Sequence, residues 1–186
     1  MSMLTAPQES SSLRTVVALP VVNQTGEKWV EHRTRLEERL NRGVKQAFES
    51  RGFTLVDAAM VNQTLNELRV DLTDEEFHRR DPLYSIGEKC KADYIILLVL
   101  TENGQNVRNN FFVSTHEGYV TVKVWLLDVK KKEPILSAKS ETAKARPSGP
   151  LGLTKGSDAQ LTAADRVVPA ILKPFLDKYP LISKAE

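Results

Sequence analysis

This sequence contains one cysteine, almost no net charge and no apolar run of membrane-spanning length, and each of these excludes a class of protein. A single cysteine, Cys90, excludes an intramolecular disulfide and a site built from several thiolates. With 26 basic and 24 acidic side chains and no broad basic stripe, the chain lacks the charge expected of a nucleic-acid-binding protein. No run approaches the ~20 apolar residues of a transmembrane helix. A chain with 41% hydrophobic and 27% charged residues has the composition of an ordinary globular domain.

The sequence also lacks a recognisable catalytic constellation. Its three histidines, His32, His78 and His116, are far apart and stand beside no serine or cysteine motif, so a nucleophile with its base is not indicated. The acidic segment 71–81 matches neither a calcium loop nor a zinc-binding helix, and the glycines do not gather into a phosphate-binding loop. We therefore expect a protein without enzymatic activity, without a cofactor and without a bound metal.

Two long strands near the middle of the chain are the clearest structural signal. The segment 92–101 is a continuous apolar run, which is typical of a strand covered on both faces, and the segment 118–129 partly alternates. We expect the two to be antiparallel neighbours. A third strand is expected after the turn Lys130–Lys132, whose charges favour a solvated surface.

The first part of the chain predicts a strand–helix–strand unit. Strands at 13–22 and 53–56 flank an amphipathic helix, so they are expected to lie parallel through a right-handed crossover. Gly52 is expected to end that helix as a left-handed cap. The apolar face of the helix is predicted to consist of Val30, Leu36, Leu40, Val44, Ala47 and Phe48.

Capping signals predict further helices. The predicted caps are Asp57 for a helix at 58–68, Thr73 with Glu76 for a short turn, and Asp81 with Pro82 for a helix at 82–91. Cys90 falls on the apolar face of the helix at 82–91 and is expected in or near the core. A last helix from Ser157 contains Pro169 and Pro174, which predict a kinked or divided helix because proline removes a backbone donor.

These elements predict the fold class α/β, with one mixed β-sheet of about five strands in the order βαβααβββα and helices packed on it. The domain is expected over 13–180, with a mobile loop at 146–156. A flexible tether at 1–12 and a short tail at 181–186 are expected to flank it.

The segment between the two long strands is the candidate for a contact with a partner. Residues 102–110 are rich in turn formers, yet two adjacent phenylalanines follow, and both cannot face one core from a regular strand. Either they form a short strand covered on both faces, or one ring is tucked under the loop, or they are an exposed aromatic contact for another chain. The candidate contact residues are Arg108, Phe111, Phe112 and His116.

Four motifs carry a resemblance to a known family. The first is Val16–Gly26, an apolar strand that ends in proline and is followed by an Asn-containing turn, and the second is Gly52–Phe53, before which the helix ends. The third is Lys91–Ile96, in which an Ala-Asp pair precedes the central strand. The fourth is Trp125–Val129, in which an Asp-Val pair precedes a lysine-rich turn. Over roughly 15–145 and the last helix, the chain resembles the domain shared by the curli-secretion lipoproteins and the TolB amino-terminal domain. The resemblance implies an α/β domain of bacterial envelope proteins that act through protein contacts in secretion or assembly, without catalysis or cofactor.

The resemblance also implies a location and partners. The partners would be other envelope proteins, copies of this chain included, and no nucleic acid. Lipoproteins of that family carry a signal peptide and a lipidated cysteine, and neither occurs at Met1–Pro7. We expect the periplasm or the outer-membrane periphery if a signal peptide was removed, with membrane association only through a lipid anchor. Taken literally, the sequence predicts a cytoplasmic protein, and the alternative is a cytosolic ligand-binding or regulatory domain.

Overall fold

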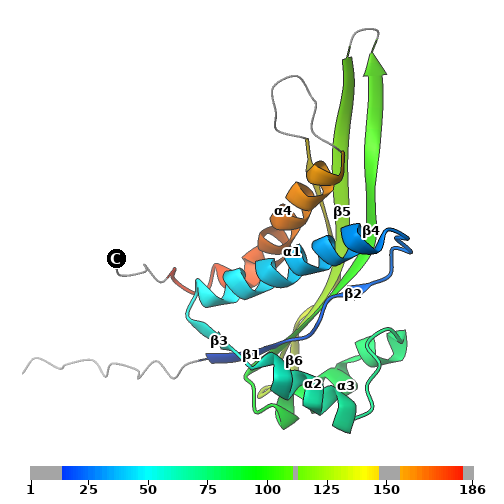
Figure 1. Cartoon of the computed structure of the whole chain (residues 1–186). Coiled ribbons are helices and arrows are strands. Elements are labelled where there is room, and N and C mark those ends of the chain that lie inside the picture. The colour runs from blue at the N-terminus through cyan, green and yellow to red at the C-terminus, as the bar shows by residue number, and fades with distance from the viewer. Residues whose placement is uncertain (1–13, 111–112, 147–155, 182–186) are drawn as a thin grey trace, which may run out of the picture.

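Six strands form one mixed sheet in the computed structural model, which describes residues 14–110, 113–146 and 156–181 (Figure 1). The elements are β1 (Arg14–Ala18), β2 (Val22–Asn23), α1 (Val30–Glu49), β3 (Phe53–Leu55), α2 (Ala58–Glu67), the 3-10 helix η1 (Glu75–His78), α3 (Arg80–Lys89), β4 (Tyr94–Asn110), β5 (Val113–Asp128), β6 (Glu133–Ala145) and α4 (Gly156–Leu176). The strand order is β3-β1-β4-β5-β6, with β2 also paired to β4. The predicted α/β class and mixed sheet are confirmed. The segments predicted as a tether at 1–12 and as most of a loop at 146–156 lie outside the described residues.

The amino-terminal half of the sheet is parallel. β1 lies between β3 and β4 and runs parallel to both, and Gly52 ends the intervening helix region with a φ of +79°, as predicted. The strand predicted at 13–22 is divided, however. β1 stops before Pro20, which has no N–H to donate, and β2 then pairs with β4 at Val99 and Leu100.

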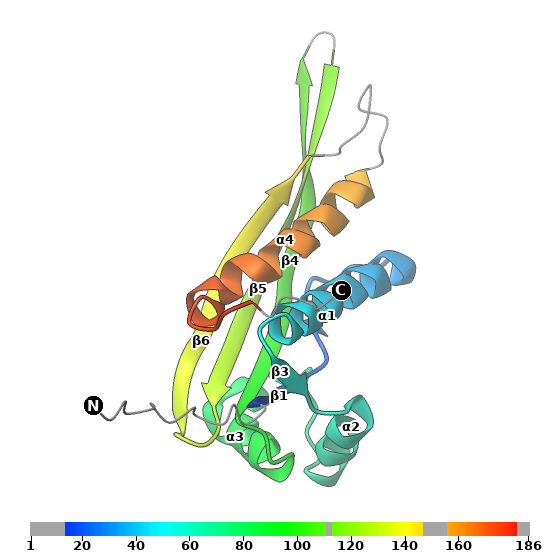
Figure 2. The ribbon, with the colours of Figure 1, turned by 90° about the vertical axis from the view of Figure 1, so that its left-hand side faces the viewer.

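The core has two parts, one on each face of the sheet (Figure 2). Side chains alternate along β4, so Ile96, Leu98 and Leu100 pack with α1 and α4. Their neighbours Ile95, Leu97 and Val99 pack with α2 and α3 on the opposite face. This explains why β4 begins as an unbroken apolar run, and it confirms the prediction of a strand covered on both faces.

Helix α1 buries most of its predicted apolar face but not the start of it. Leu36, Leu40, Val44 and Phe48 are buried, as the periodicity predicts. Val30 was placed on the same face, and this prediction is wrong because its side chain is 63% exposed. Val30 is the first residue of α1, and the first buried position, Leu36, comes nearly two turns later.

The capping predictions are confirmed in one case and wrong in two. Asp57 accepts a hydrogen bond of 2.8 Å from the Ala59 N–H and caps α2. At η1 the cap is Asp74, which accepts from the Glu76 N–H at 2.9 Å, in place of the predicted Thr73. Helix α3 begins at Arg80, so Asp81 lies inside the first turn, and the N-cap residue makes no side-chain cap bond. That helix therefore starts without the aspartate cap that was predicted.

A kinked or divided helix was predicted, and α4 is not divided, because it runs as one helix through both prolines. Pro169 and Pro174 both lie on the exposed side of the helix, opposite its buried face. A proline leaves the carbonyl four residues earlier without its helical donor. Because the carbonyls of Asp165 and Ala170 belong to exposed residues, water can hydrate them and the helix can continue.

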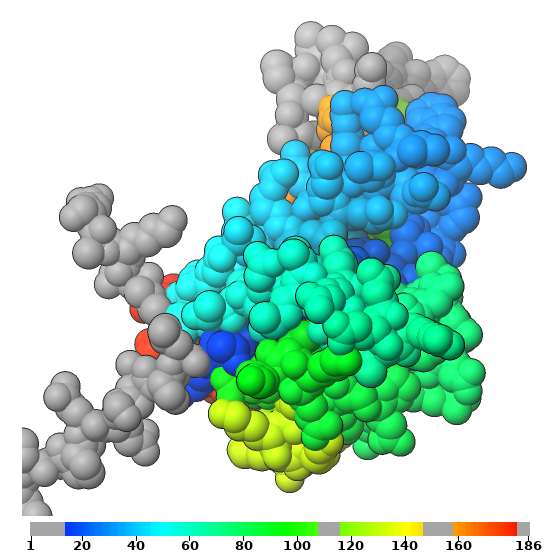
Figure 3. Space-filling view, turned by 60° about the horizontal axis from the view of Figure 1, so that its bottom comes forward, coloured from blue at the N-terminus to red at the C-terminus, as the bar shows by residue number. Residues whose placement is uncertain are grey.

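The Ala-Asp and Asp-Val motifs have structural roles. Asp93 accepts hydrogen bonds from the Thr15 N–H at 2.7 Å and the Thr15 hydroxyl at 3.1 Å, and it forms an ion pair with Lys130. Asp128 accepts from the Lys131 N–H at 2.9 Å. The two carboxylates thus fix the turn between β5 and β6 to the strands beneath it, and Figure 3 shows this turn (yellow) against the green segment that includes α3.

Candidate functional site: a projecting ribbon and the surface beside it

Strands β4 and β5 extend beyond the rest of the sheet. After a register shift at Thr101 they pair continuously from Glu102 opposite Thr121 to Asn110 opposite Val113, whereas β6 pairs with β5 only as far as Ala145 opposite Gly118. Residues 105–110 and 113–118 therefore form a two-stranded ribbon, called the ribbon below, which Figures 1 and 2 show projecting past α4 and the end of β6. The prediction of a turn-rich loop at 102–110 is wrong, because these polar residues continue β4.

Two glycines at the root of the ribbon allow close packing. A Cβ on Gly118 would lie 2.5 Å from the carbonyl carbon of Ala159, so the backbone of α4 crosses β5 at this point. A Cβ on Gly104 would lie 2.5 Å from the Tyr119 hydroxyl oxygen, because that ring lies over the opposite strand. The first contact involves backbone and the second a side chain, so only Gly118 fixes the position of a helix.

The structure places some of the predicted contact residues and leaves others undescribed. Arg108 occupies a position in β4 opposite Thr115, but its side chain lies outside the described residues, as do Phe111 and Phe112. His116 lies opposite Val107, with its Nδ1 buried and without a partner among the described residues. Val107 is 51% exposed, so an apolar side chain is open to solvent on the ribbon.

The most exposed large apolar side chain on the described surface was not predicted from the sequence. Trp29, which directly precedes α1, is 76% exposed, and Val30 beside it is also exposed. The chain here is held to the foot of the ribbon because the Asn103 amide donates to the Glu27 carboxylate at 3.3 Å. Asn103 and Val107 are four residues apart on β4 and so lie on the same face of it. Trp29, Val30 and Val107 are called the contact surface below.

The outer edge of β4 beside the contact surface has no strand pairing along its distal part. β2 pairs with β4 only at Val99 and Leu100, and the Gln24 N–H then donates to the Leu100 carbonyl at 2.9 Å. From Glu102 onward, no strand within the described ranges pairs with this edge. Unpaired strand edges present a row of backbone donors and acceptors to another chain.

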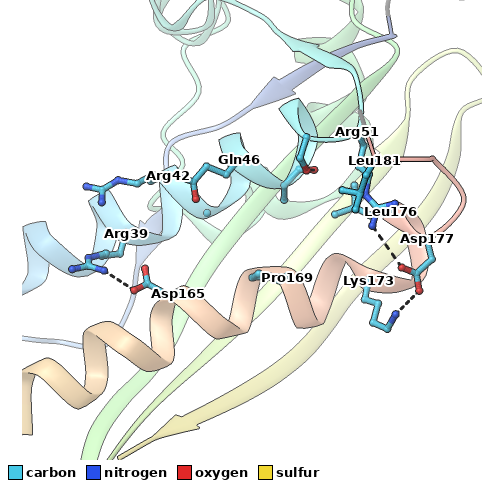
Figure 4. A pocket seen from close by; sticks show the side chains of 13 residues that line it. Arg39, Arg42, Gln46, Arg51, Asp165, Pro169, Lys173, Leu176, Asp177 and Leu181 are labelled. Carbon is cyan, nitrogen blue, oxygen red and sulfur yellow. Dashed lines mark hydrogen bonds and ion pairs between the residues drawn. The ribbon is translucent and has the colours of Figure 1, made fainter. Parts of the chain in front are cut away.

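A second surface feature is the cleft between α1 and α4, with a volume of about 710 Å³ (Figure 4). Arg39 and Arg42 line it from α1, and Asp165 and Lys173 from α4. Arg39 contacts Asp165 at 2.5 Å, and Lys173 contacts Asp177 at 2.6 Å. Because most of the cations in the cleft already have carboxylate partners, it offers little unpaired charge to a ligand.

Within the described ranges, no group of three or more histidine, cysteine, aspartate or glutamate side chains could hold a metal ion. None of the helices described is both long and apolar enough to cross a membrane. Cys90 is buried, as predicted, with its Sγ 3.4 Å from the Thr64 hydroxyl.

Solved structures that share this fold include one from Neisseria meningitidis and one from Chlamydia trachomatis. The lipoprotein GNA1162 from Neisseria meningitidis aligns with a TM-score of 0.53 and 12% identity, over 89% of this chain and 96% of that one. The hypothetical protein CT253 from Chlamydia trachomatis aligns with a TM-score of 0.51 and 14% identity, over the same shares. No protein-family model and no curated protein matches the chain. The chain therefore has a fold that occurs in a bacterial lipoprotein, and the narrower resemblance to curli-secretion lipoproteins and TolB stays a prediction.

Proposed function

We propose that this chain is a non-catalytic domain of the bacterial cell envelope that acts by binding another protein through the contact surface and the adjoining edge of β4. The observation that carries the proposal is the exposure of Trp29 beside that unpaired edge. Exposed tryptophan is the residue type that most often dominates a protein interface, and a strand edge supplies backbone hydrogen bonds to a partner strand. Together they favour recognition of another polypeptide.

The envelope assignment has two supports. The fold is shared with a lipoprotein of Neisseria meningitidis. The segments Val16–Gly26 and Trp125–Val129 also resemble those of curli-secretion lipoproteins and the TolB amino-terminal domain. We therefore propose kinship with these proteins and a role in secretion or envelope assembly, with other envelope proteins, copies of this chain included, as partners.

The non-catalytic assignment is supported by what the polar side chains do. Asp93 and Asp128 hold the β5–β6 turn, and the buried His78 donates a hydrogen bond of 2.7 Å from its Nε2 to the Leu72 carbonyl. These groups have structural partners, and within the described ranges no hydroxyl or thiol stands beside a histidine as a nucleophile would.

The contact surface is tested by changing Trp29 and Val30 together to serine. Both side chains are exposed, so we expect the melting temperature to stay unchanged while association with the partner falls by about tenfold or more. The control is Met60→Ser, which changes another exposed apolar residue, 51% exposed, on α2. Association is measured by site-specific crosslinking in envelope extracts and by light scattering of the purified chain. Equal association of both variants and the unaltered chain would contradict the proposed surface.

The location is tested separately by fractionating the bacterium that expresses the full native gene. We expect the protein in the periplasmic or outer-membrane fraction. Recovery with the cytoplasmic proteins would instead favour the cytosolic ligand-binding or regulatory alternative.

A further inference from the structure

A small pocket lies at the start of α3, on the side of the molecule away from α1 and α4. Its volume is about 400 Å³. Its walls come from the first turns of α3 and from Lys132 in the turn between β5 and β6, two segments that Figure 3 shows in contact. The lining residues are Arg80, Asp81, Tyr84, Ser85 and Lys132.

Tyr84 in this pocket has an unused hydroxyl. The residue is only 7% exposed, and its hydroxyl is buried and has no hydrogen-bond partner among the described residues. Burying a hydroxyl without a partner is unfavourable, because the group loses its hydrogen bonds to water and gains none in return. Two histidine ring nitrogens, of His32 and His116, are also buried without a partner among the described residues, but the Tyr84 hydroxyl belongs to a residue that lines this pocket.

The helix that begins at this pocket also lacks a side-chain cap at its amino terminus. α3 has ten residues and, as described above, its N-cap residue Arg79 makes no side-chain cap bond. The first N–H groups of a helix lack intrahelical acceptors and, with the helix dipole, favour an anion. The uncapped end and the unpartnered hydroxyl are independent observations, and both belong to α3 beside this pocket.

The charges around the hydroxyl favour an anion as well. Burial raises the pKa of Tyr84, and among the neighbouring charges Arg80 and Lys132 act more strongly than Asp128 and Asp81. Lys132 lies over the Tyr84 ring, with its ammonium 5.3 Å from the ring centroid, and forms an ion pair with Glu88. The Arg80 guanidinium has only a 3.5 Å contact with the Ser137 hydroxyl, so it is available to a ligand.

We propose that this pocket binds a small oxyanion, a phosphate or a carboxylate group, which accepts hydrogen bonds from the Tyr84 hydroxyl and the Arg80 guanidinium. Lys132 lies over the Tyr84 ring in the free protein, and on binding its ammonium shifts from Glu88 toward the anion. Ser85 does not take part directly, because its hydroxyl donates to the Asp81 carbonyl at 3.0 Å. The site is separate from the contact surface, so it is independent of the proposed function.

The test is a titration of the whole chain with inorganic phosphate, with sodium acetate, and with sodium chloride at matched ionic strength. Amide chemical shifts of α3 and of the β5–β6 turn report binding. We expect saturable shifts with phosphate or acetate and only small, non-saturating shifts with chloride. Saturation by phosphate alone identifies a phosphate ligand, and saturation by acetate alone a carboxylate ligand. No saturable shift with either anion overturns the proposal.

Variants separate the hydroxyl from the rest of the fold. Tyr84→Phe removes only the unpartnered oxygen, so we expect the free variant to melt at a higher temperature than the unaltered chain and to bind the anion about tenfold more weakly. Lys132→Met should weaken binding in the same way, whereas Lys131→Met, a matched change in the same turn that does not line the pocket, should leave it unchanged. Full anion affinity in Tyr84→Phe overturns the proposal.

Discussion

At the scale of single residues, Asp93 shows how one carboxylate connects three segments. It accepts hydrogen bonds from the N–H and the hydroxyl of Thr15 in β1, and it forms an ion pair with Lys130 in the β5–β6 turn. Asp93 itself directly precedes β4. We expect Asp93→Asn to lower the free energy of unfolding by about 2 kcal/mol at neutral pH, because hydrogen bonds to a charged group are lost or weakened. Urea unfolding measures the change. A variant as stable as the unaltered chain would show that the carboxylate is not needed.

The same residue predicts a pH dependence. Burial alone would raise the pKa of Asp93, but the hydrogen bonds from Lys130 and Thr15 outweigh it and hold the pKa below its ordinary value. A lowered pKa in the folded state stabilises the fold fully above the unfolded-state pKa of about 3.9 and loses that contribution as the pH falls through the folded value. The stability difference between the unaltered chain and Asp93→Asn should therefore be largest near pH 7 and shrink below about pH 4. A difference that stays constant down to pH 2 would contradict this assignment.

At the scale of elements, the packing of α4 on β5 depends on Gly118. Alanine there would place its Cβ against the α4 backbone, which cannot move aside alone, so we expect Gly118→Ala to destabilise the fold by about 3 kcal/mol. Gly104→Ala is the matched control on the neighbouring strand. Its Cβ meets only the end of the Tyr119 side chain, and alanine regains roughly 0.5–1 kcal/mol of strand preference, so its net effect should be near zero. Equal losses in the two variants, measured by chemical unfolding, would show that α4 is not held at Gly118.

The elements also show where sequence patterns predict structure and where they do not. β4 up to Leu100 is predicted correctly because its apolar run is continuous, and the buried face of α1 because its apolar residues recur with the period of a helix. The distal part of β4 has no such run: Glu102, Gln105, Asn106 and Val107 are exposed, and Asn103 and Gly104 are half-buried. The composition of this segment, rich in Asn and with Gln and Gly, is therefore typical of a loop. This segment is a strand because it pairs with β5, and a local sequence pattern does not predict that pairing.

At the scale of the whole molecule, the candidate site is only partly predictable from the sequence. Turn-like composition and two phenylalanines indicated the region between the long strands as a contact, which stays a prediction, and the structure makes the described part of that region a projecting ribbon. Trp29 was not predicted, because its exposure depends on where α1 starts relative to the core. No periodic pattern in the surrounding sequence indicates that position. Tyr84 was missed for a related reason, since an unpartnered hydroxyl is visible only once all its neighbours are in place.

The two phenylalanines give the last prediction, which concerns how the whole chain associates. Phe111 and Phe112 lie outside the described residues, but they connect Asn110 and Val113, which pair with each other. The described core extends along the strands only as far as Leu100 in β4 and Val120 in β5. We therefore expect replacement of both phenylalanines by serine to leave the melting temperature unchanged and to weaken association.

Thermal unfolding and light scattering on the same samples test this expectation. Rings that belonged to a core would instead lower stability by roughly 3 kcal/mol or more when truncated. A large loss of stability with unchanged association would contradict the contact role. If the Trp29 and Val30 double variant also weakened association, the partner would span the ribbon from its root to its tip. If only that variant had an effect, the contact would be confined to the root, where Glu27 and Asn103 join α1 to β4.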